Sequence, residues 1–129
     1  MNTWQAQYDF WSSFGLPAYN EFTSIDEEIF NEQDKFPYLT YEAFSGVYDQ
    51  VRAVNVSLWY RSATWEDISL KADQIGTAIG EGVTLPVDGG MMWIHKSNTT
   101  PFAQPVDTGY ADKQIKRINL LVEIEFLKS

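Results

Sequence analysis

Residues 58–65 read Leu58-Trp59-Tyr60-Arg61-Ser62-Ala63-Thr64-Trp65, and the hydrophobic period of the sequence changes across them. Before this stretch, apolar residues recur with a period of about 2, which is typical of a half-buried β-strand. After it, they recur with a period of about 3.6, which is typical of an amphipathic α-helix. The stretch therefore predicts a strand that ends at Tyr60 and Arg61, a short turn, and the start of a helix.

The helix after this corner is the clearest helix in the sequence. Thr64 is its predicted N-cap, and Asp67 three residues on gives a variant of the capping box. Gly80 or Gly82 ends it. Its apolar face carries Trp65, Ile68, Ala72, Ile75 and Ile79. We therefore expect these side chains to lie in the core.

Alternating or β-rich runs predict the strands. They are Phe36–Phe44, Val51–Tyr60, the two arms Val83–Val87 and Met91–His95, and Gln114–Phe126. Asp88-Gly89-Gly90 between the two arms predicts a hairpin, and Pro86 places its first arm at a sheet edge. The run to Phe126 contains neither proline nor glycine, so we expect a central strand there.

Residues 2–14 predict a further helix, capped by Thr3 and stopped at Gly15 and Pro17. It carries the aromatic residues Trp4, Tyr8, Phe10, Trp11 and Phe14. Two interpretations stay open: the helix docks onto its own core, or part of its aromatic surface meets a second subunit.

Residues 96–112 predict a long loop, in which Phe102 and Gln104 between two prolines form a semi-rigid contact arm. The predicted elements give an α+β fold. We expect a mainly antiparallel or mixed sheet of four to six strands, two helices packed on one face, and the long loop and hairpin as extensions. The 129 residues fit one domain, residues 1–129.

Composition narrows the function. The net charge of −9 argues against tight nucleic-acid binding, because phosphate contacts need Lys or Arg, but it does not exclude a protein past which DNA slides. No cysteine occurs, which rules out disulfides and thiolate metal sites. We see neither a signal peptide nor a membrane span and expect a soluble protein made in a cytoplasm. The aromatic share of 16% is high and favours protein contacts.

Few residues suggest catalysis. His95 is the only histidine, and it is more often a half-exposed strand residue in such a place than a general base. Glu123 and Glu125 share a strand face near Arg117, which favours a salt-bridged solvent face over a glycosidase pair. No metal or cofactor motif is present. We therefore expect no enzyme, no metal and no cofactor.

Charged residues are segregated along the chain. Residues 21–34 are acidic and include Glu27 and Glu28, whereas Lys113, Lys116 and Arg117 cluster before the last strand. The acidic segment is either a solvated loop or a surface that faces a basic partner or a DNA channel. The basic cluster either solubilises a strand edge or meets the acidic segment of a neighbouring subunit.

The chain resembles a known family in the order and spacing of several motifs. These are Phe36-Pro37-Tyr38-Leu39-Thr40-Tyr41, the corner at residues 58–65, Gly89-Gly90-Met91-Met92-Trp93-Ile94, Pro101-Phe102-Ala103-Gln104, Ile115-Lys116-Arg117-Ile118 and Glu125-Phe126-Leu127. In this order, over about residues 4–127, they resemble the tail terminator or tail-to-head joining proteins of long-tailed siphophages of Gram-positive hosts. Such proteins are sometimes labelled minor capsid proteins.

The resemblance implies a structural role in the virion. Members of the family are α+β proteins that form a hexameric ring on the last ring of the tail tube, end tail polymerisation and join the tail to the head connector or stopper at the neck. DNA passes through the ring without specific binding, and no membrane or catalytic residue is involved. Assembly takes place in the host cytoplasm. By this resemblance, Trp59, Arg61, Thr64 and Trp65 form a structural corner rather than a site.

We expect subunit or partner contacts at the terminal helix, the charged segments and the long loop. The candidates are Trp4, Trp11, Glu27, Glu28, Phe102, Gln104, Lys113, Lys116 and Arg117. Two other functions stay open. One is a different neck component, such as a head-completion or stopper protein. The other is a glycan- or peptide-binding module that uses exposed Trp and Tyr.

Overall fold

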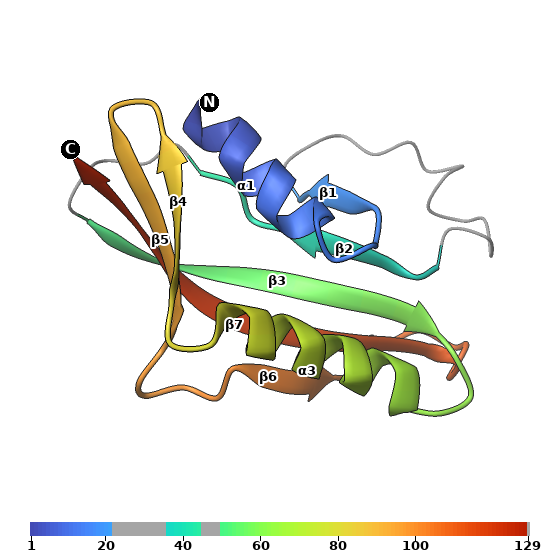
Figure 1. Cartoon of the computed structure of the whole chain (residues 1–129). Coiled ribbons are helices and arrows are strands. Elements are labelled where there is room, and N and C mark those ends of the chain that lie inside the picture. Colours follow the sequence, from blue (N-terminus) through green and yellow to red (C-terminus); the bar gives the residue numbers. More distant parts are fainter. Residues whose placement is uncertain (22–35, 45–49, 129) are drawn as a thin grey trace.

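The computed structural model describes residues 1–21, 36–44 and 50–128 of the chain (Figure 1). Within this part the fold is α+β, as expected: two helices pack against a curled, mixed sheet. The helices are α1 (Thr3–Ser12) and α3 (Glu66–Ile79). The strands are β1 (Ala18–Asn20), β2 (Tyr38–Tyr41), β3 (Val51–Arg61), β4 (Val83–Val87), β5 (Gly90–Lys96), β6 (Ala103–Val106) and β7 (Ile115–Lys128).

The long antiparallel pair of β3 and β7 organises the sheet. The strand order is β1-β2-β3-β7-β5-β4, and only β1 and β2 pair in parallel. One edge of β7 pairs with β3, whereas its other edge pairs first with β6 and then with β5. Alternate residues of β7 are buried from Lys116 to Phe126, so the prediction of a long central strand is confirmed.

The sheet has seven strands, one more than the upper limit that we expected. Two strands are additional to the five listed from the sequence. They are β1 and β6, and β6 lies inside the predicted loop of residues 96–112. The expectation of a loop at residues 103–106 was therefore wrong. The sequence there does not predict a strand, because it contains Pro105 and no alternating apolar pattern. The predicted hairpin is confirmed: β4 pairs with β5, Gly89 has a positive φ of 84° in the turn, and β4 lies at the sheet edge.

Most of the predicted apolar face of α3 is confirmed, but the predicted start of the helix was wrong. Its buried residues include Ile68, Ala72, Ile75 and Ile79, and Gly80 ends it. Trp65, however, is the N-cap residue and is 42% exposed, so the expectation that it lies in the core was wrong. Thr64 precedes the cap, and its Oγ1 only accepts a 3.4 Å hydrogen bond from the N–H of Glu66.

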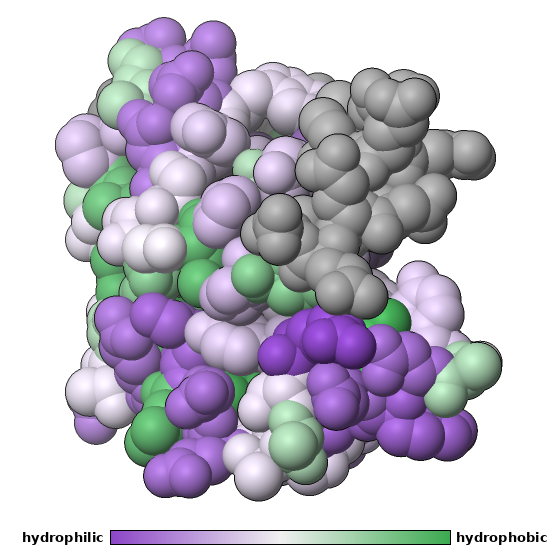
Figure 2. Space-filling model, turned by 90° about the vertical axis from the view of Figure 1, so that its right-hand side faces the viewer, coloured by the Kyte–Doolittle hydropathy of each residue, from purple (hydrophilic) through white to green (hydrophobic). Residues whose placement is uncertain are grey.

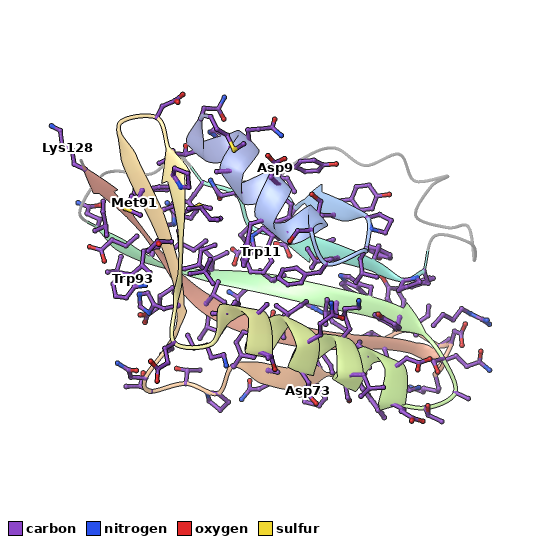
Figure 3. All side chains as sticks on the ribbon, viewed as in Figure 1. Asp9, Trp11, Asp73, Met91, Trp93 and Lys128 are labelled. Carbon is purple, nitrogen blue, oxygen red and sulfur yellow. The ribbon has the colours of Figure 1, made fainter. Side chains whose placement is uncertain are left out.

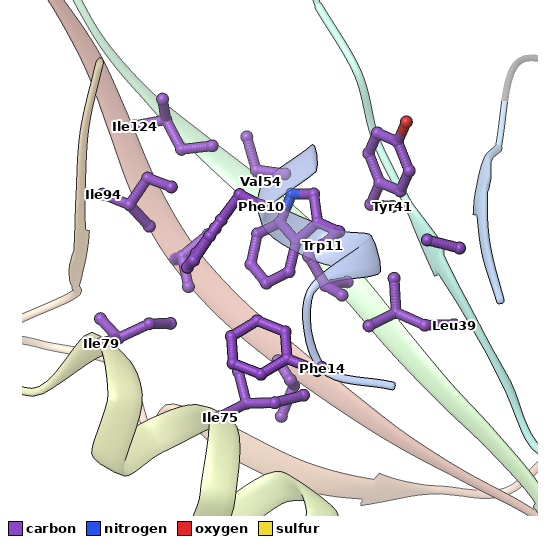
Figure 4. Close-up of a cluster of buried hydrophobic side chains, with 14 of the residues drawn as sticks. Phe10, Trp11, Phe14, Leu39, Tyr41, Val54, Ile75, Ile79, Ile94 and Ile124 are labelled. Carbon is purple, nitrogen blue, oxygen red and sulfur yellow. The ribbon is translucent and has the colours of Figure 1, made fainter. Parts of the chain in front are cut away.

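The helix α1 docks onto the same core as α3. Its N-cap is Asn2 rather than Thr3, because the Asn2 side chain accepts a hydrogen bond from the N–H of Gln5 at 2.8 Å. Phe10, Trp11 and Phe14 point into the cluster shown in Figure 4, between residues of β2 on one side and of α3, β5 and β7 on the other.

One buried polar side chain fixes the position of α1. The amide of Gln7 donates to the carbonyl of Phe44 at 3.0 Å and accepts from the N–H of Phe44 at 3.2 Å. It also donates to the carbonyl of Thr3 at 3.0 Å. Because buried polar groups are costly without partners, these bonds set how α1 lies against the chain after β2.

Candidate assembly surfaces

The sheet face opposite the helices carries a row of side chains that crosses three strands. Tyr38 of β2 lies opposite Trp59 of β3, which lies opposite Arg117 of β7. The rings of Tyr38 and Trp59 stack with centroids 6.0 Å apart, and the Arg117 guanidinium carbon lies 5.0 Å from the Trp59 centroid. Tyr110 approaches Trp59 at 6.4 Å. The two aromatic rings and the cation therefore stabilise one another.

A second row of polar side chains holds the first row in place. The indole of Trp59 donates to the hydroxyl of Thr40 at 3.1 Å, and Arg117 Nε donates to the hydroxyl of Ser57 at 2.9 Å. Beside them, burial raises the pKa of the Glu21 carboxyl and the charge of Glu42 raises it further, whereas Arg117 and the Thr40 hydroxyl oppose the rise. The row is a fixed structural unit within the sheet.

The other corner residues lie around the end of β3. Arg61 Nε forms an ion pair with Asp112 at 3.1 Å, which ties the end of β3 to the segment before β7. Hydrogen bonding by the N–H of Gln114 is the main cause that lowers the pKa of Asp112, and Arg61 adds to it. Thr64 and Trp65 follow at the start of α3. The corner therefore joins β3, β7 and α3, as a scaffold would.

The predicted basic cluster is divided between the two faces of β7. Arg117 points to the face opposite the helices, where it lies over Trp59. Lys116 is buried on the helix side, and its Nζ lies 5.5 Å from the Trp65 centroid and donates to the carbonyl of Lys113 at 2.9 Å. Only Lys113 is exposed. The expectation of one basic patch is therefore wrong, because alternate strand residues face opposite sides.

The contact arm is also corrected. Phe102 is partly buried against the core, and a Cβ added to Gly76 of α3 would lie 3.1 Å from its ring. The Nζ of Lys96 lies 5.1 Å from the Phe102 centroid, and the carbonyl of Phe102 accepts a hydrogen bond from Leu121. Phe102 thus anchors the arm to its own fold. Gln104 is exposed on β6, where the expectation of a partner contact is untested.

The two candidate tryptophans of the terminal helix differ in their exposure to solvent. Trp11 is completely buried between α1 and the sheet, so it cannot meet a second subunit in this fold, and we correct that assignment (Figure 3). Trp4 is 44% exposed, and Tyr8 one turn on is similarly exposed. Glu27 and Glu28 lie outside the described residues.

An apolar groove of about 420 Å³ lies between α1, β4 and the last turn of α3. Its walls come from Ala6, Phe10, Phe14, Ala78, Val83 and Leu85. Asp9 carries the one ionisable side chain among these lining residues, and Met1 adds its N-terminal ammonium group. The Met1 ammonium forms an ion pair with Asp88 of the hairpin turn at 2.6 Å. We call this hollow the α1–β4 groove.

A second hollow, of about 320 Å³, lies at the other end of α3. Trp65, Tyr110, Lys113 and Lys116 are among its lining residues, and we call these four residues the Trp65 surface. Trp65 and Tyr110 are well exposed, as is Leu70 on the next turn of the helix. Figure 2 views the molecule from this side, where hydrophilic residues cover much of the lower part and hydrophobic ones form small separate patches.

Sequence reasoning missed the exposed Leu70 and Tyr110 and the groove. Leu70 carries a usable signal, because it is an apolar residue off the buried stripe of α3. Tyr110 lies between Gly109 and Ala111 in a segment without periodicity, and nothing in the sequence marks it. The groove forms only when α1 meets β4, so its lining is not visible as a local pattern.

The remaining candidate chemistry is sparse. His95 Nδ1 lies 3.5 Å from the Glu123 carboxylate and 3.1 Å from the carbonyl of Lys96, and its ring packs on Trp93 with centroids 4.1 Å apart. Among the residues that the structure describes, no group of three or more His, Asp or Glu side chains could hold a metal ion.

A scan against protein-family models finds no match for this chain, and a search of curated proteins also finds none. No helix in the described ranges is long and apolar enough to cross a membrane.

Proposed function

We propose that this chain is a structural virion protein that forms a ring, hexameric by its resemblance, at the head-proximal end of a phage tail tube. In this role it ends tail polymerisation and joins the tail to the head connector while DNA passes through the ring. The observation that carries the proposal is the exposure of large hydrophobic side chains around α1 and, separately, around the start of α3. A subunit of a closed ring needs two different surfaces for its two neighbours.

These side chains lie in different parts of the molecule. Met1, Trp4 and Tyr8 lie on or beside α1. Met91 of β5 and Val51 of β3 are also exposed, but they lie on the sheet face opposite the helices. Trp65, Leu70 and Tyr110 lie around the opposite end of α3. Trp and Tyr are enriched at protein interfaces, so the exposed aromatic side chains at these places favour a protein that associates.

The positions of the positively charged side chains favour a passage through which DNA moves without being bound. Among the residues that the structure describes, four cations lie over aromatic rings of the same chain. They are Arg52 over Phe44, Lys96 over Phe102, Lys116 over Trp65 and Arg117 over Trp59. Side chains held in this way are not arranged to follow a phosphate backbone. With a net charge of −9, the chain repels DNA rather than binding it.

The geometry removes Trp59 from the side chains that a glycan-binding module could use. Tyr38 stacks on Trp59 and Arg117 lies over its ring, so its indole is not an open platform for a sugar. A different neck component, such as a stopper, remains the alternative within the same structural class, because it too needs protein contacts and no catalytic site.

Light scattering of the purified chain, alone and mixed with the tail-tube protein of the same phage, tests the proposal. We expect a discrete oligomer, or an oligomer that forms on tube ends. A chain that stays monomeric and leaves the tubes uncapped contradicts the proposal. Binding to portal-proximal proteins but not to tubes favours the stopper alternative.

A further inference from the structure

Residues 97–111, between β5 and β7, run along one edge of β7, and we call them the strap. The structure describes all of them, and none of them is buried. β6 lies within the strap and pairs with β7, and among the described strands none pairs with the other edge of β6. Backbone pairing and a few side-chain contacts therefore hold the strap, which is typical of a segment that opens locally.

Two contacts fasten the strap near its ends. Near its start, the Phe102 ring lies 3.1 Å from where a Cβ on Gly76 of α3 would lie, and the Nζ of Lys96 lies 5.1 Å from the ring centroid. Just beyond its end, Asp112 forms the 3.1 Å ion pair with Arg61. Of the strap residues, only Phe102 packs against the core cluster. Phe102 is therefore the contact that an opening of the strap has to break.

The second half of the strap packs loosely against the rest of the fold. Pro105, Val106 and Tyr110 of the strap line the hollow of about 320 Å³ together with Trp65 at the cap of α3. Tyr110 is 50% exposed, and its ring centroid lies 6.4 Å from that of Trp59. Because little apolar surface is covered here, uncovering it costs little free energy.

The register of β6 on β7 decides which backbone groups depend on the strap. The N–H of Leu121 donates to a carbonyl of the strap at 2.8 Å. Because bonded and non-bonded positions alternate along an antiparallel pair, the N–H groups of Arg117 and Asn119 also face β6. Those of Ile118 and Leu120 face β3 instead. We call the first three the edge amides and the last two the inner amides.

We propose that the strap opens as one unit, with Phe102 as its latch, while the rest of the sheet stays folded. Opening leaves the edge amides without partners and turns a covered stretch of β7 into a free sheet edge. The inner amides keep their partners, because β7 pairs with all 11 residues of β3. The inference goes beyond the ring-forming function and does not depend on it, since it concerns the single chain.

Hydrogen exchange of the purified chain at residue resolution, at several urea concentrations below the unfolding transition, tests the opening. We expect the edge amides to exchange together and at least about tenfold faster than the inner amides. Urea should change the exchange of the edge amides little, because opening exposes little surface, and should accelerate that of the inner amides steeply. If both sets exchange at one rate with one urea dependence, the strap opens only on global unfolding and the proposal is overturned.

A matched pair of alanine substitutions in the strap tests the latch. Phe102→Ala removes the ring that packs over Gly76 and should accelerate exchange of the edge amides about tenfold or more. Gln104→Ala shortens an exposed side chain two residues on and should leave their exchange unchanged. Edge amides that exchange in F102A as slowly as in the wild type would show that Phe102 is not the latch.

Discussion

Trp11 and Trp65 show how one residue type serves two purposes in this chain. Trp11 is completely buried beneath α1, whereas Trp65 stands 42% exposed at the cap of α3, with Lys116 over its ring. Both lie on apolar patterns in the sequence. Their environments differ because Trp11 lies on the face of α1 that packs on the core, whereas Trp65 is the N-cap of α3 and precedes its first buried residue, Ile68.

Trp11→Ala should lower the free energy of unfolding by about 3–5 kcal/mol, because it removes a large side chain from the centre of the core and leaves a cavity. Trp65→Ala is the control and should cost less than about 1 kcal/mol, since half-exposed side chains contribute little to the core. Urea denaturation monitored by far-UV circular dichroism measures both. Equal losses for the two variants would show that Trp65 is part of the core after all.

We expect the Glu21 carboxyl to make the free energy of unfolding depend on pH. Burial and the neighbouring Glu42 raise its pKa above the ordinary value of 4.5, so the folded state binds the proton more tightly than the unfolded state. The stabilisation from this group is therefore present below the unfolded-state pKa and is lost as the pH rises through the folded-state pKa.

Glu21→Gln should accordingly be more stable than the wild type at pH 7, and the difference should shrink as the pH approaches 4. Urea denaturation at the two pH values, with the exposed Glu81→Gln as control, provides the measurement. A Glu21→Gln variant that is less stable than the wild type at pH 7 contradicts this assignment and points to a favourable Glu21–Arg117 attraction instead.

Among the elements of the fold, the connection between β5 and β6 is anchored to α3. Phe102 packs over Gly76, in the interior of a helix where glycine costs about 1 kcal/mol relative to alanine. That cost is offset if the missing side chain makes room for the Phe102 ring. Both strands pair with the same edge of β7, so the excursion between them needs such an anchor.

Phe102→Ala should lower the free energy of unfolding by about 1–3 kcal/mol, less than a fully buried Phe because the ring is only partly covered. Gln104→Ala, two residues on and exposed, should change it by less than about 0.5 kcal/mol. Chemical denaturation of the two variants distinguishes them. An unchanged stability for Phe102→Ala would restore the earlier interpretation of this residue as part of a free contact arm.

The sequence was most informative where one face of an element is buried along its whole length. Such burial leaves a periodic pattern in the sequence, and the elements that carry one were predicted. The pattern is an alternation in Val51–Arg61 and Ile115–Lys128 and an apolar helical stripe from Ile68 to Ile79. β6 was missed because its four residues pair with β7 through the backbone and bury little side chain. Asn2 and Thr3 are both good caps, and only the geometry separates them.

The candidate surfaces were less predictable than the fold. Arg117 and Lys116 are neighbours in the sequence but lie on opposite faces of β7, so the basic residues do not form one charged surface. The α1–β4 groove combines residues from about position 6 to position 85, and its existence depends on how α1 settles beside β4. Sequence periodicity carries no information about such long-range packing.

The whole molecule is an acidic chain with an apolar groove at one end of α3 and ordered aromatic residues at the other. This polarity suits head-to-tail association into a closed ring on a tail tube. Its surplus of negative charge suits a passage for DNA.

Electron microscopy of tail tubes polymerised with and without the purified chain tests whether the chain forms a ring that ends the tube. We expect a ring of density at one end of each tube and shorter tubes as the chain is added in larger amounts. Tubes that grow to the same length with bare ends in the presence of the wild-type chain would contradict the account.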